Sequence, residues 1–311
     1  MSTEPLGTGP VSTEPLRTAA AGTAHRATPA PVRVAGGRWR DDARAVKVVW
    51  RRELIRFGRN RLRIVTSLVQ PVLFLFVLGT GLSSLVSKGL PAGSGVNFRT
   101  FMFPGVVAMT VLFTSIFSAV SIVWDREFGF LREMLVAPVR RGALVAGKCA
   151  GGATVATLQA LIMLALAGLV GVPYSPLLLL TLAGEMLLAA VTITALGTAL
   201  ASRMAQVESF QVVMQFVVLP LFFLSGALFP IRGLPTWLSI LTRLDPLAYV
   251  VDPMRRAVFA HMHTTPAVAK VFGATMTWGS WHVPVSLELG LTAAFGALML
   301  GLAIVAFSRT D

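Results

Sequence analysis

Long stretches of this chain carry no charged side chain, and no other feature constrains the fold as strongly. Residues 100–123 contain no Asp, Glu, Lys or Arg, and neither do residues 149–184. About 20 consecutive apolar residues are enough for a helix to cross the hydrocarbon core of a bilayer. Charged residues make up only 13% of the chain, whereas a soluble domain has about 25%. The sequence therefore predicts an all-α, polytopic membrane protein.

We expect six membrane-spanning helices within a transmembrane domain at 62–308. A longer connection, residues 230–283, separates the last two. The approximate bounds of the six spans are residues 62–85, 100–123, 146–171, 177–201, 210–229 and 284–307.

Basic residues are concentrated before the first expected span. Of the 27 Lys and Arg residues, 13 lie before Ile64, and such a flank marks the cytoplasmic side of a span. Residues 1–40 are expected to form a disordered cytoplasmic tail, and residues 41–61 a basic amphipathic helix at the membrane surface. Six spans also place the C-terminus in the cytoplasm. The charges indicate contact with membrane lipids and do not indicate a nucleic-acid partner.

The connection at residues 230–283 is too polar for a span and too apolar for an ordinary loop. Asp245-Pro246 and Asp252-Pro253 each resemble a helix start, with Asp as the cap and Pro as the first helical residue. We therefore expect short helices here that lie at the outer interface or dip into it.

Two carboxylates fall inside expected spans, both toward the outer half. A charged side chain in a membrane is costly, so Glu185 and Glu288 are candidates for a functional role. The alternatives are pairing with a loop arginine such as Arg232 or Arg243, or simple exposure at the interface. The candidate substrate path comprises Glu185, Glu288, Phe222 and Phe223.

Signatures of enzymes are weak. The segment Gly142–Lys148 has the spacing of a phosphate-binding loop, but Cys149 stands where Ser or Thr would hold Mg²⁺. Gly and Lys at the cytoplasmic foot of a span explain this segment better, because a lysine there can extend to the interface. A single cysteine and the pair His261 and His263 make a weak case for a metal site. We expect no catalytic residue, no metal and no cofactor bound by this chain.

The charged segment between the second and third spans is the most informative connection. Trp124, Phe128, Leu131 and Leu135 are spaced 4, 3 and 4 residues apart, which would place them on one face of a helix. Asp125, Arg126, Arg132 and Glu133 lie largely off this stripe, and Pro138 ends it. Such a helix could lie on lipid or insert into a groove of a partner, and composition alone does not decide between the two.

These residues resemble the ABC-2 type permeases, the membrane subunits of one class of ATP-binding-cassette exporter, and among them the branch typified by daunorubicin exporters. The resemblance covers roughly residues 42–308. It departs from the family at Asp245, where Asn is expected, and at Pro253. The matching residues are Phe103-Pro104-Gly105, Asp125-Arg126-Glu127-x-Gly129-x-Leu131-Arg132-Glu133-x-Leu135-x-x-Pro138-x-x-Arg141, Gly147-Lys148, Leu224-Ser225-Gly226-x-x-Phe229-Pro230, Pro235-x-Trp237-Leu238 and Asp245-Pro246-Leu247-x-Tyr249-x-Val251-Asp252-x-x-Arg255.

The resemblance implies an ATP-driven exporter in a bacterial plasma membrane. Two permease copies would pair, and each would bind a separate ATPase subunit that holds ATP and Mg²⁺. The segment from Trp124 to Arg141 would dock on that subunit as a coupling helix. Re-entrant helices before the last span would include Pro235, Trp237, Asp245, Pro246, Tyr249, Asp252 and Arg255. The substrate would be a hydrophobic drug, an antibiotic or a lipid-like molecule moved outward.

Three other functions remain open at this point. Export of a polysaccharide or lipid-linked glycan is compatible with the same family. A secondary transporter driven by an ion gradient would need a relay of charged groups within the membrane, which the expected spans lack. A membrane-embedded enzyme acting on lipids would need a catalytic cluster, for which only Glu185, Glu288 and His282 are available.

Overall fold

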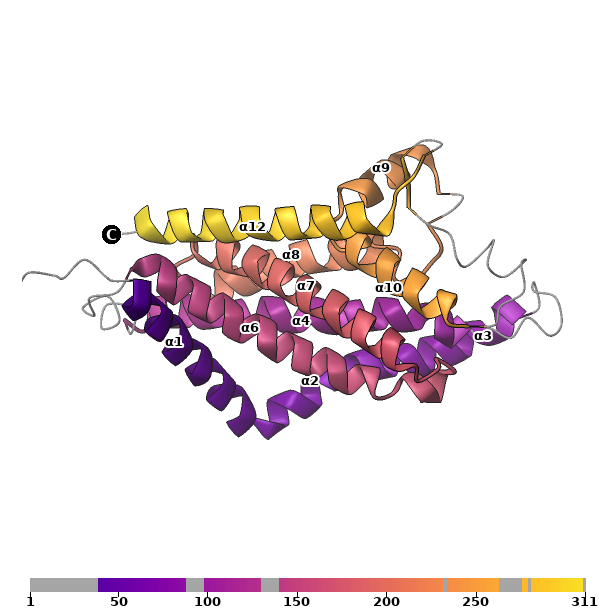
Figure 1. Ribbon diagram of the computed structural model, residues 1–311, viewed down its shortest axis with the longest axis horizontal. Coiled ribbons are helices and arrows are strands. Elements are labelled where there is room, and N and C mark those ends of the chain that lie inside the picture. Colours follow the sequence, from indigo (N-terminus) through magenta and orange to yellow (C-terminus); the bar gives the residue numbers. More distant parts are fainter. Residues whose placement is uncertain are drawn as a thin grey trace, which may run out of the picture. The chain divides into compact units, whose positions relative to one another are not determined.

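The computed structural model describes residues 39–87, 98–129, 140–231, 234–262, 276–278 and 281–309, which form a bundle of helices (Figure 1). In chain order the elements are α1 (Trp39–Arg59), α2 (Arg61–Leu73), the π-helical segment η1 (Phe74–Leu78), α3 (Gly79–Ser87), α4 (Phe98–Glu127), α6 (Arg141–Leu164), the 3-10 turn η2 (Ala167–Val170), α7 (Pro176–Ala201), α8 (Val207–Leu224), α9 (Thr236–Leu244), α10 (Ala248–Ala260), the strands β1 (Thr277–Trp278) and β2 (Trp281–His282), and α12 (Val285–Arg309).

Six helical stretches among these residues are long and apolar enough to cross a bilayer, which confirms the expected number and the all-α class. They are Ile64–Ser83, Phe98–Glu127, Arg141–Leu164, Pro176–Ala201, Val207–Leu224 and Val285–Ser308. The short antiparallel hairpin of β1 and β2 is the one paired strand element in the described part of the chain.

Several bounds differ from those expected. Helix α4 continues past residue 123 to Glu127, and α6 begins at Arg141 rather than at residue 146. Charged side chains follow or precede the apolar runs at these points, and they have partners within the bundle that let the helices continue. In contrast, α6 ends at Leu164, where 171 was expected, and α8 ends at Leu224, where 229 was expected.

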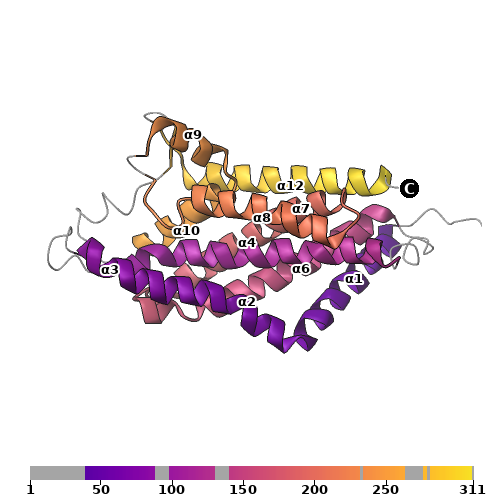
Figure 2. The ribbon, with the colours of Figure 1, turned by 180° about the vertical axis from the view of Figure 1, so that it is seen from behind.

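The amphipathic helix expected at 41–61 begins two residues earlier, since Trp39 and Arg40 form the first turn of α1. These two residues had been assigned to the disordered tail. Figures 1 and 2 show α1 running at an angle to α2, so that the two helices form a V beside the bundle. Pro71 lies inside α2 and is followed by the π-helical segment η1, in keeping with local rewinding of a helix near a proline.

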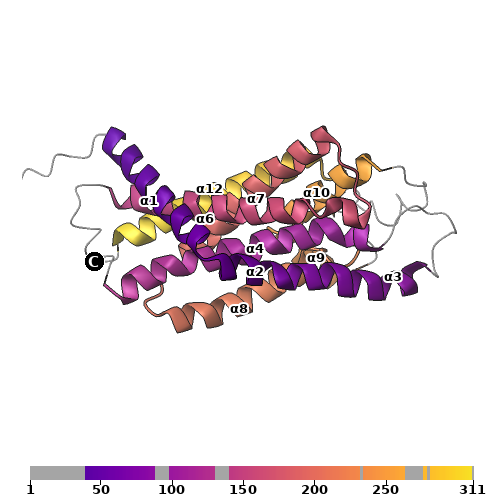
Figure 3. The ribbon, with the colours of Figure 1, turned by 90° about the horizontal axis from the view of Figure 1, so that it is seen from below.

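Helix α4 forms the centre of the bundle, in contact with α2, α6, α7, α8 and α10 (Figure 3). Its side chains from Phe101 to Leu112 are all buried. A Cβ atom at Gly105 would lie 2.4 Å from the carbonyl oxygen of Ala227, a buried residue three positions after the end of α8. Only glycine at position 105 therefore lets the backbone of Ala227 come this close to α4.

The connection before the last span contains α9 and α10, and α10 is mostly buried between α4, α7 and α12. The expectation of a helix start at Asp252-Pro253 is wrong, because both residues lie inside α10. Proline removes the hydrogen bond to the carbonyl oxygen four residues earlier, which here belongs to Tyr249. That oxygen lies 3.5 Å from the Thr292 hydroxyl, which also donates to the carbonyl oxygen of Glu288 at 2.9 Å.

We predict that replacing Gly105 with Ala destabilises the bundle by about 1–3 kcal/mol, the usual cost of overpacking. The matched control is Gly184→Ala, because a Cβ at Gly184 meets nothing within 4 Å and alanine is the better helix former. Apparent Tm in detergent measures both variants. Equal Tm values for the two variants would contradict the close packing at Gly105.

Candidate functional site

A buried lysine joins three helices at the end of the bundle where α1 begins, α4 ends and α6 begins, which we call the α1 end (Figure 1). The Lys148 ammonium on α6 forms an ion pair with the Asp125 carboxylate on α4, and Nζ lies 3.8 Å from Oε1 of Glu53 on α1. It also donates to the carbonyl oxygen of Ser121 at 3.3 Å. The Lys148 side chain is only 5% exposed. The expectation that Lys148 extends to the membrane interface is therefore wrong, because two carboxylates from neighbouring helices hold it inside.

Two glycines of α6 allow this cluster to form. A Cβ at Gly147 would lie 2.9 Å from Cβ of Val49, and one at Gly151 would lie 2.7 Å from Cβ of Glu53. Small residues at this spacing let α1 lie directly against α6. The same contact includes a hydrogen bond from the Trp50 indole to the Thr154 hydroxyl at 3.0 Å.

The two charged residues after Asp125 tie the end of α4 to the start of α8. Arg126 donates to the carbonyl oxygen of Met204 at 2.9 Å. The Glu127 carboxylate accepts from the backbone N–H of Val207 at 2.9 Å and so satisfies one open donor at the start of α8. The resemblance places these residues in the docking segment, and Asp125, Arg126 and Glu127 each also have a partner within the chain.

The aromatic residues at the same place are exposed. Trp124 is 44% and Phe128 63% exposed, and their rings meet edge to face with centroids 6.1 Å apart. The Arg56 guanidinium lies 5.6 Å from the centroid of the Trp124 ring. The chain then turns at Gly129, whose φ of 78° suits glycine.

The remainder of the expected coupling segment is described only at its end. Leu131, Arg132, Glu133, Leu135 and Pro138 lie outside the described residues. Arg141 is the first residue of α6, and its guanidinium donates to the carbonyl oxygen of Ser308 on α12 at 3.2 Å. Residues 142–148, which have the spacing of a phosphate-binding loop, form the first turns of α6, so their backbone N–H groups belong to a helix rather than a loop.

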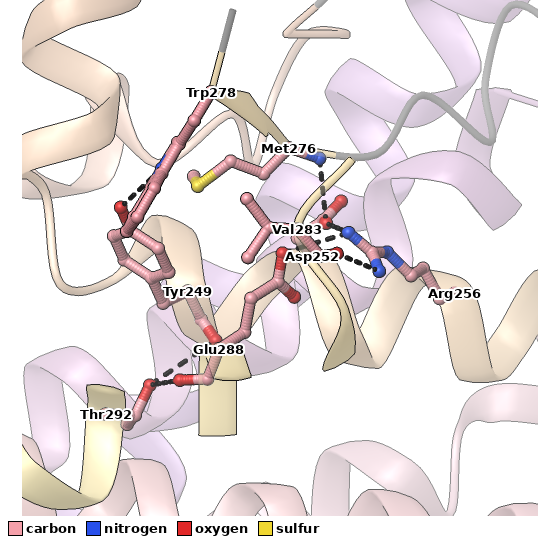
Figure 4. A network of polar contacts seen from close by, with 8 residues as sticks. All are labelled: Tyr249, Asp252, Arg256, Met276, Trp278, Val283, Glu288 and Thr292. Carbon is pink, nitrogen blue, oxygen red and sulfur yellow. Dashed lines mark hydrogen bonds and ion pairs between the residues drawn. The ribbon is translucent and has the colours of Figure 1, made fainter. Parts of the chain in front are cut away.

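A second cluster of charges lies at the opposite end of the bundle, among α10, the hairpin and α12 (Figure 4). Arg256 forms ion pairs with Asp252 and with Glu288, the latter at 2.9 Å. It also donates to the carbonyl oxygen of Val283 at 2.8 Å, and Asp252 accepts from the backbone N–H of Met276 at 3.0 Å. Glu288 is fully buried. Among the described residues the arginine that pairs with it is thus Arg256 and not Arg243, and Glu288 is not exposed at the interface; Arg232 lies outside the described residues.

The four residues of the candidate substrate path fall into two places. Glu185 on α7 is 7% exposed, and its Oε2 has no hydrogen-bond partner among the described residues. Phe222 on α8 is buried and meets Phe74 of η1 and Phe223 with ring centroids 6.1 and 5.7 Å apart. Phe222 therefore packs α8 against the first span, while Glu185 and Glu288 lie on α7 and α12.

The expected re-entrant residues have different surroundings. Pro235 precedes α9, whose Trp237 is 64% exposed. The Tyr249 hydroxyl donates to the carbonyl oxygen of Arg243 at 2.8 Å and accepts from the Trp278 indole at 3.2 Å. Arg255 is buried, with its guanidinium 4.2 Å from the centroid of the Phe101 ring.

Asp245 lies in the turn between α9 and α10, just before Pro246, and is 3% exposed. One carboxylate oxygen accepts from the backbone N–H of Leu247 at 2.8 Å, and the other has no hydrogen-bond partner among the described residues. Burial raises the pKa of Asp245 to about 8, although the hydrogen bond from Leu247 acts in the opposite direction.

Six apolar helices, with short helices inserted before the last one, define a multi-pass membrane protein. A family model described as ABC-2 type transporter matches residues 44–259. The chain belongs to this family of transport permeases, the membrane subunits of ABC transporters, which act with an ATPase partner.

Individual relatives agree with this assignment. The chain is 31% identical to nodulation protein J of Rhizobium meliloti (strain 1021) over 212 residues, which cover 67% of this chain and 78% of the relative. It is 25% identical to the inner membrane transport permease YadH of Escherichia coli (strain K12) over 235 residues, which cover 75% of this chain and 90% of the relative.

We predict that Lys148→Met destabilises the protein by about 3–5 kcal/mol, because it removes the buried cation from the Glu53 and Asp125 carboxylates and leaves only the half-exposed Arg52, 3.9 Å from Asp125, beside them. Asp125→Asn in the same chain should recover part of the loss, since one of those charges is then absent. Apparent Tm in detergent for the wild type, both single variants and the double variant measures the coupling. Additive losses would show that the two side chains do not interact.

We predict that Asp245 makes stability depend on pH. Its carboxyl group is protonated in the folded protein up to about pH 8, whereas in the unfolded chain it loses its proton near pH 4. The folded state therefore binds more protons in this range, and stability falls as pH rises by up to about 1.4 kcal/mol per unit. The loss levels off above pH 8. Asp245→Asn should lack this component in apparent Tm measured from pH 5 to 9, and parallel curves for both proteins would exclude it.

Proposed function

We propose that this permease exports a hydrophobic drug, an antibiotic or a lipid-like molecule, using ATP bound and hydrolysed with Mg²⁺ by a separate nucleotide-binding subunit. In this proposal the chain has no ATPase site of its own, two copies pair, and the complex lies in a bacterial inner membrane with both termini in the cytoplasm. The relative YadH, described as an inner membrane permease, supports that location.

The exposed pair Trp124 and Phe128 is the observation that carries this proposal. A large aromatic surface at a charged helix end is costly to leave in water, and aromatic side chains are the usual anchors of protein interfaces. It stands at the end of α4, in the first turns of the segment that the resemblance assigns to coupling. We assign this pair to the docking surface for the ATPase subunit.

The end of α4 is held by three neighbouring helices, so a force applied there is transmitted to them. Lys148 fixes Asp125 to α1 and α6, and Glu127 fixes the same turn to α8. A displacement of Phe128 by a partner would therefore act on four helices together. Because well-packed helices move as rigid bodies, movement of the ATPase would change the relative positions of the spans.

We predict that replacing both Phe128 and Leu131 with Asp abolishes co-purification of the ATPase subunit and abolishes export. Two buried charges at the contact would outweigh the binding free energy of a small interface. Co-purification, ATPase activity and substrate efflux are measured, with membrane insertion verified by protease accessibility.

The control is Phe128→Leu, which keeps an apolar side chain and should retain most binding. The proposal fails if the Asp variant still binds the ATPase as the wild type does.

A further inference from the structure

A cavity of about 430 Å³ lies between the arms of the V formed by α1 and α2 and the faces of α4 and α6. This volume is within the range typical of sites for small organic molecules. One wall is aromatic, with Phe113 and Phe117 of α4 stacked at a centroid distance of 6.3 Å and Trp124 about two turns further on. Phe117 and Trp124 are each more than 40% exposed, so a molecule in the cavity can contact both rings.

The opposite wall is polar. Gln159 on α6 is 1% exposed, and its amide joins the Thr114 hydroxyl on α4 to the Ser67 hydroxyl on α2. Gln70 continues this wall along α2. Side chains of this kind are expensive within a bilayer and usually line a route for a polar group.

The cavity reaches well into the membrane. Ser67 and Pro71 follow the start of α2 at Arg61 by six and ten residues, which at 1.5 Å per residue is about 9 and 15 Å. The hydrocarbon core is about 30 Å thick. If α2 enters at the headgroups, the hydrogen-bonding wall lies between the inner interface and the middle of the bilayer.

The rim of the cavity carries one carboxylate, which is already paired, and one guanidinium, which keeps its positive charge. Glu53 faces the Lys148 ammonium, and the Arg56 guanidinium lies over the Trp124 ring. The remaining polar groups described above are amides and hydroxyls, which both donate and accept hydrogen bonds. The cavity therefore suits an uncharged head group better than a cation.

We propose that this cavity binds the exported molecule as it leaves the inner leaflet, and that the molecule is an uncharged amphiphile with hydroxyl, amide or carbonyl groups beside an apolar or aromatic body. The inference rests on the proposed function, because it names the substrate class of the same transporter. The hydrogen-bonding groups would lie against Gln70 and the Ser67 and Thr114 hydroxyls, which the buried Gln159 amide holds in place, and the apolar body against Phe113 and Phe117.

Photolabelling of the full-length protein in lipid nanodiscs tests this assignment without an ATPase subunit. Two probes share one diazirine-bearing alkyl chain, and carry either a neutral glucoside or a trimethylammonium head group. Mass spectrometry then locates the labelled residues. We expect saturable labelling of α2, α4 and α6 around the cavity, with a preference of roughly five-fold for the glucoside, the size of effect that one or two hydrogen bonds produce.

Two variants and a control separate binding from folding. Gln159→Leu should remove the preference for the glucoside, and Thr66→Trp should reduce labelling by both probes because it fills the cavity from α2. The same exchange outside the cavity, Gln206→Leu, should change neither. The apparent Tm of each variant is measured first, to verify that it folds. If Gln159→Leu does not fold, Thr66→Trp still tests the cavity with the Gln159 side chain in place.

Equal labelling by the two probes, labelling that does not saturate, or a preference for the trimethylammonium probe would overturn the inference. A preference for the glucoside that is lost in Gln159→Leu, with labelling by both probes reduced in Thr66→Trp, would support it even if the chain failed to bind an ATPase. The co-purification experiment with the Phe128 variants tests the proposed function separately.

Discussion

The ion pairs of Lys148 are the interaction on which the arrangement of the α1 end depends. Taking a lysine and two carboxylates out of water costs several kcal/mol for each group unless they meet one another. Each of the three charges comes from a different helix, so only one relative placement of α1, α4 and α6 neutralises them together. The glycines of α6 make that placement sterically accessible. This anchor lies one turn from Trp124 and Phe128, so the proposed docking surface and the point where α4 joins the bundle are nearly the same place.

The far end of the bundle is held in the same way, by one cation between two carboxylates. There one arginine, Arg256, lies between two carboxylates and joins α10 to α12, and the backbone of the hairpin completes the set of hydrogen bonds. Apolar and small side chains fill the space between the two clusters, and α4 runs through it as a buried helix. Specific polar contacts thus fix the ends of the helices, where short inserted elements must be oriented. Close packing is sufficient in the middle, where long helices lie side by side.

The sequence predicted the six spans because long uncharged runs have few other stable solutions in a protein. The predicted span ends were less accurate. They assumed that a charged residue ends a helix, whereas Glu127 and Arg141 have partners inside the bundle. The partner of Lys148 on α1 could have been suspected, because Glu53 follows Val46, Val49 and Trp50 on the apolar face of an otherwise basic helix. The position of Pro253 inside α10 could not, because the side chain beside the freed carbonyl oxygen of Tyr249 is Thr292, far along the chain. Pairings of this kind depend on the tertiary fold and leave no local pattern.

The cavity and the docking surface share a side chain, which gives them a physical reason to influence each other. Trp124 forms part of the cavity wall and also meets Phe128 in the exposed aromatic pair, while Glu53 and Ser121 both line the cavity and hold Lys148. A molecule that moves Trp124 on binding changes the surface offered to the ATPase. Linkage then requires that docking change the affinity for that molecule by the same factor. Coupling between substrate and ATPase needs no long pathway in this arrangement, because both would act on the same turn of α4.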